Sequence, residues 1–178
     1  MKKTTINFIT NSAIGIALFV VLSLCLQVPV FQNYYLCLGY VAMTVYCYSI
    51  GTASGTIVGT IGVILYCLLI SGLRGMPGWA MGNLFLGIIM GTTFRLIKKN
   101  QKPIVETIIA VIIIIISTAI AMLGIKSIIE CLLYSQPFMV RVATNMYAFI
   151  ADAFVIIVSL PLCRILEPHI NKIFKKNA

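Results

Sequence analysis

The sequence has very few charged residues, and this shortage excludes most classes of water-soluble protein. Only 10% of its 178 residues are charged, whereas 61% are hydrophobic and the mean hydropathy is +1.07. A soluble domain carries about 25% charged and about 45–50% apolar residues. Because a helix needs about 20 apolar residues to cross a membrane, the length allows for about six such helices with their connections. The composition therefore predicts an all-α integral membrane protein, in which residues 1–178 form one six-helix transmembrane domain.

Catalytic groups are also scarce. The chain has four acidic residues and one histidine, His169, and no glycine-rich loop followed by Lys-Ser/Thr that would cradle ATP phosphates. The segment 51–55 superficially resembles a nucleophile motif, but no base is placed to activate Ser54. The four acids are spread along the chain, and the six cysteines show no Cys-x-x-Cys pairing. We therefore expect no catalytic residue, cofactor or metal ion, and binding or transport remains as the function.

Six apolar segments are separated by polar or proline- and glycine-containing breaks. They cover approximately residues 8–28, 34–48, 55–70, 79–97, 104–125 and 138–166. The first segment is longer than a signal-peptide core and no small-residue cleavage site follows it, so we interpret it as a membrane helix. We expect the moderately polar stretch 126–137 to connect the last two helices, and it is a candidate lid.

The basic residues are distributed unequally between the two sides of such a bundle. With six spans, both termini and the second and fourth connections lie on one side. That side holds ten of the thirteen Lys and Arg residues: Lys2, Lys3, Arg95, Lys98, Lys99, Lys102, Arg164, Lys172, Lys175 and Lys176. Because these residues accumulate on the cytoplasmic side, both termini are predicted to be cytoplasmic. The charges then act as topology determinants that contact lipid phosphates, which argues against nucleic acid as a partner despite the net charge of +9.

Polar side chains within apolar helices are costly in hydrocarbon unless they face a partner or water. In the sixth segment, Asn145 and Asp152 are two turns apart and share one face, and Arg141 lies one turn before Asn145. In the fourth segment, Trp79 and Asn83 are one turn apart near the outer surface. We predict that Asn83, Asn145 and Asp152 line an outward-facing pocket, with Trp79 and Arg141 near its mouth. The alternative is that Asn145 and Asp152 only tie helices together.

Small residues at four-residue spacing indicate where helices approach closely. Gly51, Gly55 and Gly59 form such a series on the third helix, and we expect it to pack against similar glycine pairs on the fourth. Ala13 and Ala17 form an Ala-x-x-x-Ala motif on the first helix.

This layout resembles the substrate-binding S component of an energy-coupling factor (ECF) vitamin transporter. The resemblance is carried by six helices in 178 residues, cytoplasmic termini, the Ala13–Ala17 motif and the glycine-rich third helix that leads into residues 73–83. It implies a protein of the bacterial cell membrane that binds a water-soluble vitamin from outside. It also implies docking through Ala13 and Ala17 on a membrane-embedded coupling protein, whose two cytoplasmic ATPases supply the energy.

Within this family, the sequence resembles the branch that binds riboflavin, hydroxymethylpyrimidine, pyridoxine and pantothenate. No cluster of arginines is evident, which disfavours an anion such as pantothenate. Asp152 with asparagine and aromatic residues suits a neutral heteroaromatic ring, stacked on Trp79 or Tyr40 and hydrogen-bonded by Asn83 and Asn145. We therefore favour a pyridoxine-like or hydroxymethylpyrimidine-like substrate, with riboflavin and pantothenate as alternatives. A self-sufficient channel or ion-coupled carrier is the competing function, although no internal repeat relates residues 1–97 to residues 98–178.

Cysteine labelling tests the predicted orientation. In a variant without native cysteines, an impermeant maleimide applied to intact cells should label Gly75→Cys. It should not label Asn100→Cys until the membrane is permeabilised. Labelling of position 100 and protection of position 75 would reverse the orientation.

Overall fold

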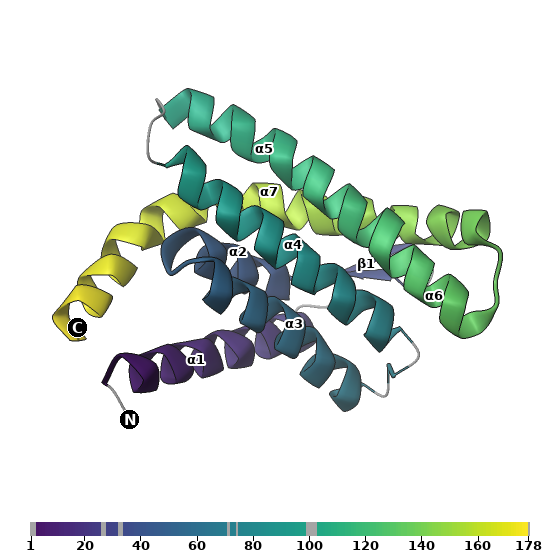
Figure 1. Cartoon of the computed structure of the whole chain (residues 1–178), viewed down its shortest axis with the longest axis horizontal. Coiled ribbons are helices and arrows are strands. Elements are labelled where there is room, and N and C mark those ends of the chain that lie inside the picture. The colour runs from purple at the N-terminus through teal and green to yellow at the C-terminus, as the bar shows by residue number, and fades with distance from the viewer. Residues whose placement is uncertain are drawn as a thin grey trace.

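The computed structural model describes residues 3–25, 28–31, 34–70, 72–73, 75–98 and 103–177. Its helices are α1 (Lys3–Cys25), α2 (Gly39–Ser49), α3 (Thr52–Leu69), α4 (Met76–Ile97), α5 (Pro103–Ala119), α6 (Ser127–Tyr134) and α7 (Phe138–Asn177), and a π-helical segment, η1 (Ile120–Lys126), joins α5 to α6. A short antiparallel hairpin of β1 (Val28–Phe31) and β2 (Tyr34–Leu36) follows α1. The predicted helical bundle is confirmed, with this hairpin as an addition (Figure 1).

Five helical segments of the described chain are long and apolar enough to cross a membrane. They are Ile6–Cys25, Thr52–Leu69, Met76–Ile97, Ile104–Tyr134 and Phe138–Ile170. These segments coincide with five of the six predicted spans. Between 28% and 50% of the residues in their apolar windows are buried within the protein, which leaves broad apolar faces on the outside of the bundle.

The second predicted span, residues 34–48, is not a full-length helix. Residues 34–36 belong to β2, and α2 has only 11 residues, about 16 Å at 1.5 Å per residue against about 30 Å of hydrocarbon. Nine of its residues are buried, and it contacts α1, α3, α4 and α7. The β-branched and aromatic residues on both sides of positions 32–33 favour the hairpin over an earlier start of the helix.

The predicted connection 126–137 is also mostly helical. The fifth helix continues through η1 and α6 to Tyr134, and Ser135, in the left-handed conformation, ends it. The polar residues of this stretch are inward-facing: Lys126, Ser127 and Glu130 are all buried. Their polarity therefore marks an internal site rather than a loop. The other predicted break, between α4 and α5, lies mainly in residues 99–102, outside the described residues.

Glycines allow close approach between neighbouring helices. Gly87 and Gly91 of α4 lie directly against α3, as predicted, because an added Cβ would meet threonine backbone there. Gly55 and Gly59 of α3 lie instead against α2. The predicted groove on α3 thus accommodates the short buried helix rather than α4.

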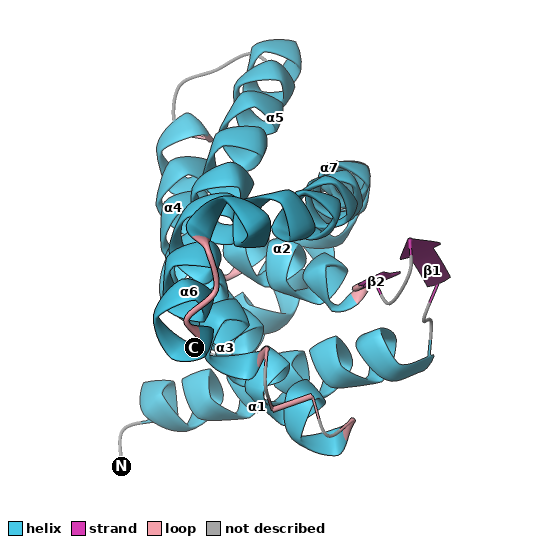
Figure 2. Ribbon diagram, turned by 90° about the vertical axis from the view of Figure 1, so that its right-hand side faces the viewer, coloured by secondary structure: helices cyan, strands magenta, loops and turns pink. Residues whose placement is uncertain are grey.

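The helices of the bundle gather at two opposite ends. The beginning of α1, the end of α4, the beginning of α5 and the end of α7 gather at what we name the first end (Figure 1). The end of α3, the beginning of α4, α6 and the beginning of α7 form the second end. Figure 2 shows α1 and α5 on opposite sides of the bundle, with α2 between them.

Candidate functional site

A chain of buried and partly buried hydrogen bonds joins three helices in the half of the bundle nearer the second end. The indole Nε1 of Trp79 on α4 donates to the hydroxyl of Tyr40 on α2 at 2.8 Å. That hydroxyl donates to Oδ1 of Asn83 at 2.7 Å, and Nδ2 of Asn83 donates to the carbonyl of Gly59 on α3 at 3.1 Å. Tyr40 and Asn83 are completely buried. The structure thus places three predicted site residues in direct contact.

Asp152 lies beside the same group. It comes from α7, is 4% exposed, and its carboxyl group interacts with the Tyr40 hydroxyl. We name Tyr40, Trp79, Asn83 and Asp152 the inner cluster. The cluster combines two aromatic rings, an amide and a carboxylate, contributed by three helices. Such groups recognise a polar aromatic ligand.

Asn145 and Arg141 belong to a neighbouring group between α6 and α7. The Asn145 amide Nδ2 donates to Ser127 Oγ and to Glu130 Oε2, both at 3.0 Å. Arg141 Nη1 lies 3.7 Å from the same Glu130 oxygen. We name Ser127, Glu130, Arg141 and Asn145 the α6–α7 cluster. Asn145 therefore ties α7 to α6, and the structure does not bring it into contact with Asn83.

Sequence analysis missed Lys126, Ser127 and Glu130 as site residues. Lys126 is 9% exposed, its Nζ lies 5.9 Å from the centre of the Trp79 ring, and it interacts electrostatically with Asp152. The available signal was the spacing of Lys126 and Glu130, one turn apart after a long apolar run, which is compatible with one inward-facing stripe of a helix.

Two structural features bring these residues into the bundle. The wide turn of η1 ends at Lys126, and π-helical turns inside helices occur frequently at functional sites. The small residues at the beginning of α4 let this segment approach: a Cβ on Gly78 would lie 3.0 Å from Glu130 Cγ, and one on Gly82 would lie 3.1 Å from the Ala121 carbonyl oxygen. The α4 glycines therefore determine how closely the segment that carries Lys126 and Glu130 approaches α4.

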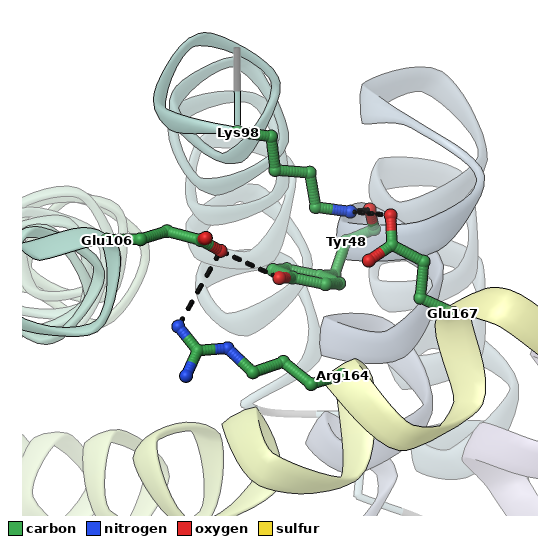
Figure 3. A network of polar contacts seen from close by, with 5 residues as sticks. All are labelled: Tyr48, Lys98, Glu106, Arg164 and Glu167. Carbon is green, nitrogen blue, oxygen red and sulfur yellow. Dashed lines mark hydrogen bonds and ion pairs between the residues drawn. The ribbon is translucent and has the colours of Figure 1, made fainter. Parts of the chain in front are cut away.

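A second polar network lies at the first end (Figure 3). Lys98 Nζ contacts Glu167 Oε1 and the Tyr48 carbonyl oxygen, both at 2.5 Å, and lies over the Tyr48 ring. The Tyr48 hydroxyl donates to Glu106 Oε1 at 2.7 Å, and Arg164 Nη2 lies 3.7 Å from that oxygen. The network joins α2, the end of α4, α5 and α7. It borders a cavity of about 590 Å³.

Ala13 and Ala17 are both exposed on the outside of α1. Large apolar neighbours on the same helix are exposed as well, including Ile14, Leu18 and Val21. Only 28% of the α1 window is buried, the lowest share among the five spans. The two alanines therefore form a shallow place on an apolar surface that faces away from the bundle.

All six cysteines are free, and no group of three His, Cys, Asp or Glu side chains in the described residues could hold a metal ion. Burial raises the pKa of the Cys37 thiol to about 12, which keeps it protonated and poorly nucleophilic.

Comparisons with known proteins identify relatives of this bundle. The family model for the S component of ECF-type riboflavin transporters matches residues 3–168. The crystal structure of the S-component for biotin from an ECF-type ABC transporter superposes with a TM-score of 0.65 at 17% sequence identity, and the match covers 94% of each chain. At this identity the similarity establishes the fold. No curated protein sequence matches the chain.

Proposed function

Because the chain belongs to the family of S components of ECF-type riboflavin transporters, we propose that it binds a neutral heteroaromatic vitamin from outside the cell and delivers it to the cytoplasm. The family membership confirms the resemblance predicted from the layout of the sequence. S components are multi-pass membrane proteins that bind vitamins for transport with an ECF module, and they are not catalytic subunits. The remaining questions concern the substrate, the contact residues and the orientation.

The inner cluster carries this proposal. Polar side chains buried among membrane helices are rare and usually functional, and four of them meet here from α2, α4 and α7. The half-buried ring of Trp79 offers a stacking surface, and the Asn83 amide has a second hydrogen and a second lone pair beyond those bonded to Gly59 and Tyr40. We therefore expect the vitamin to contact Tyr40, Trp79, Asn83 and Asp152, while Arg141 and Asn145 hold α6 against α7 beside this cluster.

The name of the matching family favours riboflavin as the first candidate. This changes the ranking from sequence alone, which favoured a pyridoxine-like or hydroxymethylpyrimidine-like compound. All three are neutral and heteroaromatic, and they remain the compounds to compare.

The orientation and the partners complete the proposal. Both termini and the first end are cytoplasmic, because this end carries Arg95, Lys98 and Arg164. α2 acts as the sixth helix of the bundle, buried and shorter than a full span. The exposed face around Ala13 and Ala17 contacts the coupling protein, and two cytoplasmic ATPases drive transport. A self-sufficient channel or carrier would instead purify without these subunits.

Ligand titration tests the pocket. Isothermal titration calorimetry of the purified protein with riboflavin should show weaker binding for Asn83→Ala and for Asp152→Asn. Asn83→Ala removes the hydrogen bonds of the amide, and Asp152→Asn removes the charge of the carboxylate. Either loss should weaken binding by about 1–3 kcal/mol, or about 5- to 150-fold in affinity. Thr92→Ala, on the exposed face of α4, is the matched control and should bind as wild type. Wild-type affinity in the double variant Asn83→Ala/Asn145→Ala would exclude the pocket.

Uptake assays test the coupling surface. Ala13→Trp and Ala17→Trp should abolish vitamin uptake in cells, because an indole on this face prevents close approach of the coupling protein. The purified variants should still bind the vitamin, since both positions are remote from the inner cluster. Ala143→Trp, at an exposed alanine of α7, should leave uptake unchanged. Normal uptake in both α1 variants would mean that these alanines face only lipid.

A further inference from the structure

The cavity at the first end is bordered by basic side chains. It has a volume of about 590 Å³ and lies between the beginning of α1, the connection from α2 to α3 and the end of α4. Its lining residues include Phe8, Ser49, Thr52, Arg95 and Lys98, and no Asp or Glu of the described chain lines it. Ligand sites in proteins usually measure about 300–1,000 Å³. The cavity therefore has the size and the charge to accept an anionic group.

Arg95 supplies a positive charge that the neighbouring network does not neutralise. In that network, Lys98 pairs with Glu167. Arg164 lies 3.7 Å from Glu106 (Figure 3), so the four charges of the network cancel. Arg95 is exposed, and its guanidinium forms no ion pair with any residue that the structure describes. Because a guanidinium can donate two parallel hydrogen bonds to a phosphate, Arg95 is available for such a contact.

The beginning of α3 adds hydrogen-bond donors to the same cavity. Gly51 has no side chain to cap this helix, and the amide of Gly55 donates to the Gly51 carbonyl. The N–H groups of residues 52–54, which precede this bond, have no intrahelical acceptor and form the positive end of the helix dipole. Ser49 also lines the cavity, and its buried hydroxyl oxygen has no hydrogen-bond partner among the described residues. Amide and hydroxyl donors therefore accompany the guanidinium of Arg95.

One wall of the cavity is apolar and belongs to α1. Phe8 lines the cavity and is 39% exposed, and its neighbours Ile6 and Ile9 are exposed as well. Arg95 lies two residues before the end of the apolar span Met76–Ile97, a depth from which basic side chains reach lipid phosphates. A soluble phosphate would make no use of the apolar wall, whereas a phospholipid can place its acyl chains along α1.

We propose that this cavity binds the headgroup of one anionic phospholipid, with the phosphate at Arg95 and the beginning of α3 and the acyl chains along α1. A zwitterionic headgroup would bring its own ammonium group to the same positive surroundings, so the site prefers phosphatidylglycerol to phosphatidylethanolamine. The site is separate from the inner cluster, which lies in the half of the bundle nearer the second end.

Lipid retention tests the role of Arg95. The purified protein is incubated in detergent with equal amounts of phosphatidylglycerol and phosphatidylethanolamine, and native mass spectrometry measures the lipid bound. Wild type should retain one phosphatidylglycerol per chain, and Arg95→Gln should retain at least fivefold less. Lys172→Gln removes the same charge from an exposed lysine of α7 and should behave as wild type. Equal retention of the two lipids, no retention by wild type, no loss in Arg95→Gln or the same loss in Lys172→Gln would each overturn the proposal.

A bulky side chain tests the cavity without changing its charge. Ala53 lines the cavity and is exposed, so Ala53→Trp should lower retention of phosphatidylglycerol at least fivefold. Ala143→Trp, at an exposed alanine of α7, is the matched control and should retain the lipid as wild type. Unchanged retention in Ala53→Trp would show that the lipid binds elsewhere. Millimolar glycerol 3-phosphate should not displace the lipid from wild type, and displacement would identify a soluble phosphate as the ligand and overturn the assignment to a lipid.

Discussion

The hydroxyl of Tyr40 connects the helices on which the rest of the structure depends. It accepts from Trp79 and donates to Asn83, so that α2 and α4 meet at one oxygen atom, with Asp152 of α7 nearby. Through Asn83 the connection extends to the backbone of α3. Hydrocarbon offers these groups no hydrogen-bond partners, and they must therefore hydrogen-bond to one another or to a ligand.

This constraint also explains why a helix of 11 residues persists inside a membrane protein. α2 is held by Tyr40 in the inner cluster and by Tyr48 in the network of Figure 3, eight residues or about 12 Å along the helix. Gly55 and Gly59 of α3 allow it to approach closely between these two points. Ion pairs join α4 and α5 to α7 at the first end, and the second end holds polar groups arranged around Trp79.

Hydropathy was sufficient to predict the long helices, because a run of about 20 apolar residues is typical of a membrane-spanning helix. Hydropathy was insufficient for α2, because the length of the apolar segment does not reveal that residues 34–36 form β2 and pair with β1. The moderate polarity of residues 126–137 predicts a connection, because the sequence does not show which residues face their polar side chains. In the structure, the Asn145 amide of α7 is the hydrogen-bond partner of both Ser127 and Glu130. The same reasoning explains the site: helical spacing places Asn145 and Asp152 on one face, but the relative rotation of α4, α6 and α7 decides that Asn145 meets Glu130 rather than Asn83.

The central claim is that the inner cluster binds a heteroaromatic vitamin. Mass spectrometry of the small molecules that co-purify with the protein from its native membrane tests this claim most directly. We expect one heteroaromatic compound at about one molecule per chain, released on unfolding and absent from Asn83→Ala purified in the same way. A folded wild-type protein that carries only lipid, or the same amount of compound in wild type and Asn83→Ala, would contradict the account.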